Sequence, residues 1–118
     1  MMREIKFRAW TDEGMINVTR ITFAGDIVYV MSDNDEHDGY EFQVGVEKLR
    51  QFTGLKDKNG KEIYEGDIIE EAQGNGVVEW LERRAAFGYL TDTATIQLYG
   101  FYGEVIGNIY ENPELLEK

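Results

Sequence analysis

The fold is decided by the stretch QFTGLKDKNGKEIYEGDII, residues 51–69. Near its centre, Asn59-Gly60 predicts a type I′ hairpin turn, because such a turn needs positive φ at both central residues and this dipeptide tolerates it. Glu65-Gly66-Asp67 predicts a second turn, and Ile68-Ile69 predicts the start of a buried strand. The stretch therefore indicates short strands joined by tight turns.

Alternation of period two continues on both sides of this stretch. In Ile5-Lys6-Phe7-Arg8-Ala9-Trp10 the apolar residues fall on one face of a strand and the basic ones on the other. Ala24-Gly25-Asp26 predicts a hairpin between two further strands. Other segments of strand length are residues 15–23, 27–31, 40–44, 77–81, 87–90, 94–99 and 105–110. We predict a mainly β fold, a small barrel-like or sandwich domain of eight or more short antiparallel strands.

Helix is expected only as short turns. Residues 46–52 fit a short helix or turn that leads into a strand, and Asn112 before Pro113 predicts one capped helical turn at the C-terminus. Glycines within or beside the strands predict bulges or sharp bends; they are Gly54, Gly66, Gly88, Gly100, Gly103 and Gly107. Because no repeat or linker interrupts the chain, we expect a single domain over residues 1–118.

The residue inventory excludes several kinds of catalysis. Among 118 residues there is one histidine, His37, one serine, Ser32, and no cysteine. A serine triad would need both residues in one acidic loop, and a zinc site needs more histidine or cysteine ligands than the chain has. We therefore expect a protein that is not an enzyme, with no catalytic, cofactor-binding or metal-binding residues.

Nucleotide and membrane motifs are also missing. Gly54 to Gly60-Lys61 encloses five residues where a P-loop has four, and Gly74-Asn75-Gly76 lacks the third glycine of a dinucleotide fingerprint. No apolar run reaches membrane-spanning length, and the N-terminus lacks the apolar core of a signal peptide. We expect a protein of the cytoplasm that does not contact membranes.

The net charge is strongly negative. Its formal value is −11 and the sequence pI is about 4.4. Residues 1–30 carry four acidic and four basic side chains, whereas residues 31–71 sum to −7 and residues 72–118 to −4. Because an acidic protein repels phosphate, direct binding to nucleic acid is not expected.

Three acidic segments are candidates for cation binding. Residues 33–38 place Asp33, Asp35 and Asp38 around His37, but they lack the glycine and glutamate positions of an EF-hand loop. A hairpin explains every residue of Asp57-Lys58-Asn59-Gly60 and is preferred there over calcium binding. The densest carboxylate group lies in residues 62–71; its members are Glu62, Glu65, Asp67, Glu70 and Glu71. Paired carboxylates could serve a hydrolase that depends on magnesium or calcium, and a solvated acidic surface is the alternative.

Aromatic residues make up 13% of the chain, and some are expected at the surface. The candidates for partial exposure are Trp10, Trp80, Tyr99, Phe101 and Tyr102. The last two lie between glycines, as in a loop tip. Packing in the core and contact between subunits are their expected uses.

Three stretches together resemble the YopX family of bacteriophages and of prophages in Gram-positive bacteria. They are MREIKFRAW from Met2, QFTGLKDKNGKEIYEGDII from Gln51 and VIGNIYENPELLE from Val105. The resemblance implies a mostly β, barrel-like protein that forms homo-oligomers, and it carries over no catalytic residue.

Our leading hypothesis is a self-associating, non-enzymatic phage or prophage accessory protein that binds a host or phage macromolecule, for example a protein. Two alternatives are kept. One is the hydrolase that depends on a divalent metal, and the other is an acidic DNA mimic whose carboxylates occupy a basic groove.

Overall fold

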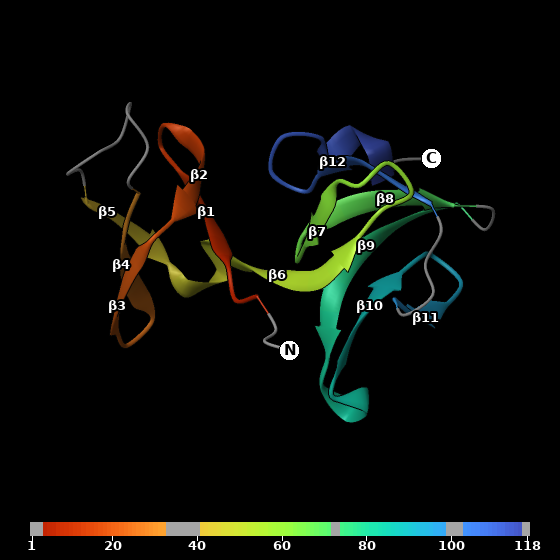
Figure 1. Ribbon diagram of the computed structural model, residues 1–118, viewed down its shortest axis with the longest axis horizontal. Coiled ribbons are helices and arrows are strands. Elements are labelled where there is room, and N and C mark those ends of the chain that lie inside the picture. The colour runs from red at the N-terminus through yellow and green to blue at the C-terminus, as the bar shows by residue number, and fades with distance from the viewer. Residues whose placement is uncertain (1–3, 33–40, 72–73, 99–102, 117–118) are drawn as a thin grey trace. The chain divides into compact units, whose positions relative to one another are not determined.

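The structure, a computed structural model, describes residues 4–32, 41–71, 74–98 and 103–116 (Figure 1). Its strands are β1 (Phe7–Thr11), β2 (Gly14–Val18), β3 (Arg20–Ala24), β4 (Ile27–Met31), β5 (Glu41–Gly45), β6 (Leu49–Lys56), β7 (Glu62–Tyr64), β8 (Asp67–Glu71), β9 (Gly74–Leu81), β10 (Ala86–Leu90), β11 (Thr95–Gln97) and β12 (Glu104–Asn108). The prediction of a mainly β fold built from short antiparallel strands is confirmed.

Helix is confined to three short 3₁₀ turns in the described part of the chain, and none of them could cross a bilayer. They are η1 (Val46–Lys48), η2 (Glu82–Arg84) and η3 (Pro113–Leu116). The first and third confirm the predicted turns at residues 46–52 and at the C-terminus. The second was not predicted; Ala85 ends it in the left-handed conformation at φ 48°.

Contacts along the chain define two compact units, residues 1–52 and residues 53–118. Strand β6 runs from one into the other. Its first residues pair with β1, and its later residues lie beside β7. Each unit is described by itself below, and the expected single domain over residues 1–118 stays a prediction.

The N-terminal unit combines a hairpin of β1 and β2 with a three-stranded sheet in the order β3-β4-β5. Its core consists of Ala9, Ile16, Val28 and Val30, each no more than 2% exposed. Val28 and Val30 are two residues apart on β4, so they lie on the same face of the sheet. The buried residues of this unit therefore follow the predicted alternation of period two.

The C-terminal unit is built on a five-stranded antiparallel sheet in the order β11-β10-β9-β8-β12, which curls strongly (Figure 1). Its core is apolar and draws on residues from the whole unit; the members are Ile63, Ile69, Val78, Tyr89, Leu98 and Val105. The register of β12 against β8 shifts between Val105 and Gly107, which confirms the bulge predicted at Gly107.

One turn differs from its prediction. The hairpin at Asn59-Gly60 exists, but Gly60 has φ +84° while Asn59 is not among the described residues with positive φ, so the turn is not type I′. The amide of Gly60 donates to the carbonyl of Asp57, and the amide of Asp57 donates to that of Lys61. This is a type I turn followed by a left-handed glycine.

Candidate functional site

The side chain of Asp57 explains the turn, because it binds the turn's own backbone. Its Oδ1 accepts hydrogen bonds from the amides of Asn59 and Lys61, both at 2.9 Å. Its Oδ2 accepts one from the amide of Val105, also at 2.9 Å. Asp57 is 7% exposed. The carboxylate therefore ties the β6–β7 turn to β12 of the same unit.

These contacts change the acidity of Asp57. Burial raises the pKa of its carboxyl, but the hydrogen bonds from the amides of Val105, Lys61 and Asn59, together with the charge of Lys61, outweigh burial and hold the pKa below its ordinary value. The charged form is thus the one that the fold stabilises. Both oxygens already serve backbone donors, which favours the hairpin interpretation of Asp57-Lys58-Asn59-Gly60 over calcium binding.

Asp67 plays a related part in the second predicted turn, which is confirmed between β7 and β8. It is 2% exposed, and its Oδ2 accepts a hydrogen bond from the amide of Tyr64 at 2.8 Å. Gly66 adopts φ +84° between them. Its amide donates to the carbonyl of Val78, and its carbonyl accepts from the amide of Ile109. The turn is therefore anchored to β9 and to the residues after β12.

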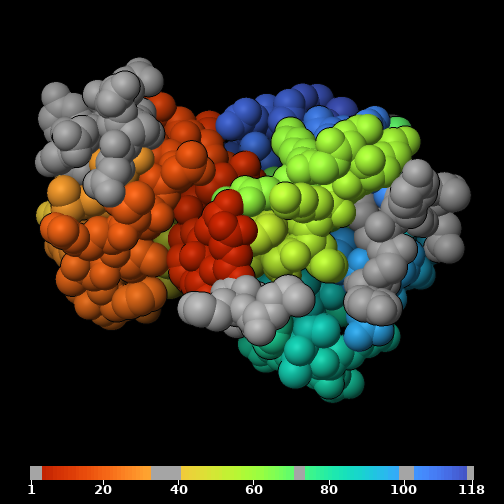
Figure 2. Space-filling view, in the orientation of Figure 1, coloured from red at the N-terminus to blue at the C-terminus, as the bar shows by residue number. Residues whose placement is uncertain are grey.

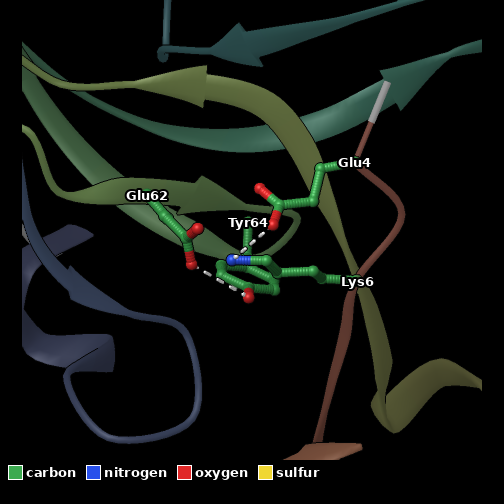
Figure 3. A network of polar contacts seen from close by, with 4 residues as sticks. All are labelled: Glu4, Lys6, Glu62 and Tyr64. Carbon is green, nitrogen blue, oxygen red and sulfur yellow. Dashed lines mark hydrogen bonds and ion pairs between the residues drawn. The ribbon is translucent and has the colours of Figure 1, made fainter. Parts of the chain in front are cut away.

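Among the described residues, the other carboxylates of the 62–71 cluster form no metal-binding group with Asp67. Glu62 is half-buried and accepts a hydrogen bond from the hydroxyl of Tyr64 at 3.3 Å, drawn in Figure 3. Glu65 lies in the turn, and Glu70 is exposed opposite Glu104 of β12. The side chain of Glu71 lies outside the described residues. In the described ranges, no three Asp, Glu or His residues are placed to hold a metal ion.

Figure 3 also draws an ion pair of the N-terminal unit. The Nζ of Lys6 lies 3.4 Å from a carboxylate oxygen of Glu4, and the two side chains are 37% and 60% exposed respectively. The same Nζ lies 5.5 Å from the ring centroid of Phe52. Exposed pairs of this kind contribute about 0–1 kcal/mol, so they do not define a site.

The structure describes only some of the other residues that the sequence singled out as candidates for cation binding or surface exposure. The acidic loop with Asp33, Asp35, His37 and Asp38 lies outside the described residues, as do Tyr99, Phe101 and Tyr102. Trp10 is half-buried on β1. Trp80 on β9 is 47% exposed, and its ring meets that of Phe87 on β10 edge to face, with 5.0 Å between centroids. Partial exposure is therefore confirmed for both tryptophans.

Sequence reasoning missed a hollow in the C-terminal unit. It has a volume of about 540 Å³ and lies between β9, the end of β10 and η3; its lining residues are Gly74, Asn75, Val77, Leu90, Asp92, Leu115 and Leu116. The side-chain amide of Asn75 donates to the carbonyl of Leu115 at 2.9 Å, which fixes η3 beside β9. Residues 40 positions apart form this wall, so no local pattern could have revealed it.

The described fold is that of a small antiparallel β protein in which the carboxylates of Asp57 and Asp67 accept hydrogen bonds from backbone amides. A family model described as YopX protein matches residues 6–117, and the chain therefore belongs to the YopX family. The crystal structure of protein EF1440 from Enterococcus faecalis is similar, with a TM-score of 0.64 and 30% identity, covering 98% of this chain and 100% of that chain. No curated protein matches the chain.

Proposed function

We propose that the chain is a non-enzymatic accessory protein of a phage or prophage. It acts in the cytoplasm of the host bacterium, associates with itself and binds a host or phage macromolecule. Membership of the YopX family supports the phage-type origin. The net charge of −11 favours a protein partner over a nucleic acid.

One observation supports the proposal most directly: acidic side chains of the stretch 51–69 hold its turns together through hydrogen bonds to the backbone. The carboxylate of Asp57 accepts three backbone hydrogen bonds, and that of the buried Asp67 accepts one from Tyr64. A catalytic carboxylate needs an oxygen that can reach substrate or a metal-bound water. The single serine, Ser32, is 1% exposed, so it is not accessible as a nucleophile.

The surface offers apolar contact residues instead. Trp80 is held by Phe87 on the hairpin of β9 and β10, yet almost half of its surface meets solvent. A rigid, partly exposed tryptophan is a frequent energetic centre of protein interfaces. Near it in the chain, Glu79, Glu82, Arg83 and Arg84 are all exposed, so a partner would meet charges of both signs around the tryptophan.

Affinity capture tests the proposal. Immobilised wild-type protein should retain a host or phage protein from lysate, and the purified partner should bind with micromolar affinity or better in calorimetry. Trp80→Ala should weaken that affinity about tenfold or more, since truncated centres of interfaces cost roughly 2 kcal/mol. Gln97→Ala, which truncates an exposed side chain on β11, is the matched control.

Two results would contradict the proposal. One is a wild-type protein that is monomeric at all concentrations and retains no partner whose binding survives purification. The other is a rise in melting temperature on adding millimolar Mg²⁺ or Ca²⁺, because specific binding to the native state raises the midpoint and would favour the metal-dependent hydrolase.

A further inference from the structure

The three-stranded sheet of the N-terminal unit has an open edge at β3. Four of the five β3 residues are exposed, and Phe23 is 66% exposed. Figure 2 shows the hairpin of β3 and β4, in orange, at the molecular surface. Proteins usually protect such edges with several charges, a proline or a bulge. Strand β3 reads RITFA, with Arg20 as its single charge, and pairs with β4 without a register shift.

The hairpin geometry decides which backbone groups face this edge. Ala24 pairs with Ile27 across a two-residue turn. Residues that flank such a turn exchange both backbone hydrogen bonds, and this role alternates along the strand. Ala24 and Thr22 therefore direct their backbone groups to β4. Those of Ile21 and Phe23 face the open edge.

We propose that β3 pairs with β3 of a second copy, antiparallel, about a two-fold axis at Thr22. The inference rests on the self-association proposed above and names its surface. In this register, Ile21 of each copy lies opposite Phe23 of the other, so about four backbone hydrogen bonds form. Ile21 already packs against the core that contains Val28 and Val30. The joined sheet therefore extends an apolar face and covers the ring of Phe23.

Charge favours a second copy as the occupant. Each chain carries −11, so two copies repel one another over most of their surface, but residues 1–30 have no net charge. The proposed register also brings Arg20 of one copy beside the turn that carries Asp26 of the other, twice by symmetry. Three of the other edge strands each carry a glutamate that would repel a second copy, namely Glu41 on β5, Glu62 on β7 and Glu104 on β12, whereas β2 and β11 carry no charge.

Cysteine crosslinking tests the register directly, because the chain contains no cysteine. Residues at the non-hydrogen-bonded centre of an antiparallel pair have Cα atoms about 4.5 Å apart, within the range that a disulfide spans. Thr22→Cys should therefore form a disulfide-linked dimer on mild oxidation. Thr93→Cys, at an exposed threonine between β10 and β11, should stay mostly uncrosslinked.

Sedimentation equilibrium provides the second measurement. Phe23→Lys should raise the dimer dissociation constant by about tenfold or more, through lost apolar contact and added repulsion. Ile5→Lys, at an apolar side chain that is 64% exposed outside β3, is the matched control and should leave that constant within about threefold. Circular dichroism confirms that both variants are folded.

The outcomes separate the two proposals. If the wild type self-associates but Thr22→Cys does not crosslink and Phe23→Lys has no effect, the β3 interface is wrong while self-association stands. If the wild type is monomeric even at about 100 μM, both self-association and the β3 interface are wrong.

Discussion

At the scale of single residues, Asp57 is central to the structure of residues 51–69, because its carboxylate accepts three backbone hydrogen bonds. We expect Asp57→Asn to lower the free energy of unfolding by about 1.5–3 kcal/mol at pH 7, because hydrogen bonds to a charged acceptor are lost and the amide group of asparagine faces the donor of Val105. Urea denaturation measures the difference. Asp12→Asn, at an exposed turn position, makes the same change of charge and should cost much less.

The lowered pKa of Asp57 fixes the pH dependence of this effect. Because the folded-state pKa lies below the ordinary value of 3.8, the stabilisation is complete above that value and is lost as the pH falls through the folded-state pKa. The stability gap between wild type and Asp57→Asn should therefore be constant near neutrality and narrow below about pH 3.8. A gap of the same size in strong acid would show that the charge of Asp57 is unimportant.

Repulsion between Glu70 and Glu104 leads to a second prediction at the scale of single residues. They lie directly opposite one another on β8 and β12, where like charges are unfavourable. We expect Glu70→Lys to raise the free energy of unfolding by about 0.2–1 kcal/mol, with a smaller gain for Glu70→Gln. Both gains should shrink in high salt, since screening weakens the original repulsion. Loss of stability in Glu70→Lys would argue that the carboxylate has a favourable partner.

At the scale of elements, a close approach between strands explains Gly88. A Cβ there would lie 2.6 Å from the carbonyl oxygen of Ile96 on β11 and would also contact Leu81 on β9. We expect Gly88→Ala to cost about 1–3 kcal/mol by forcing β11 away from β10. Faster hydrogen exchange at the amides of β11 would locate the effect.

A second variant separates the two contacts of Gly88. Leu81 has a side chain that can be shortened, whereas the Ile96 carbonyl belongs to the backbone. Gly88→Ala combined with Leu81→Ala should therefore remain destabilised relative to Leu81→Ala alone. If the double variant matched that single variant in urea denaturation, the backbone contact would be unimportant.

At the scale of the whole molecule, the charge of −11 governs association. Copies that meet at the neutral β3 edge still repel through residues 31–118, and salt screens that repulsion. We expect the dimer dissociation constant to fall as NaCl is raised from about 20 to 500 mM, because the Debye length shrinks from about 20 Å to a few ångströms. Sedimentation at fixed protein concentration measures it. A dimer that dissociates with salt would instead be held mainly by ion pairs.

The sequence alone determined where strands and turns occur, because both depend on neighbouring residues. Period-two alternation placed Val28 and Val30 on one buried face, and Asp-containing turns appeared at the predicted positions. Local reasoning failed in detail at Asn59, whose turn type depends on the carboxylate of Asp57. For the candidate carboxylates, the sequence revealed their number and spacing but not what each of them binds.

The tertiary structure alone decided which strands pair and what each carboxylate binds. Asp57 reaches the amide of Val105 across 48 positions, and β8 lies between β9 and β12 in its sheet. Such contacts form only when distant segments close a loop, and alternation cannot specify which strand is the neighbour. The open edge of β3 is a result of the same kind, since a strand becomes an edge only through the order of the sheet around it.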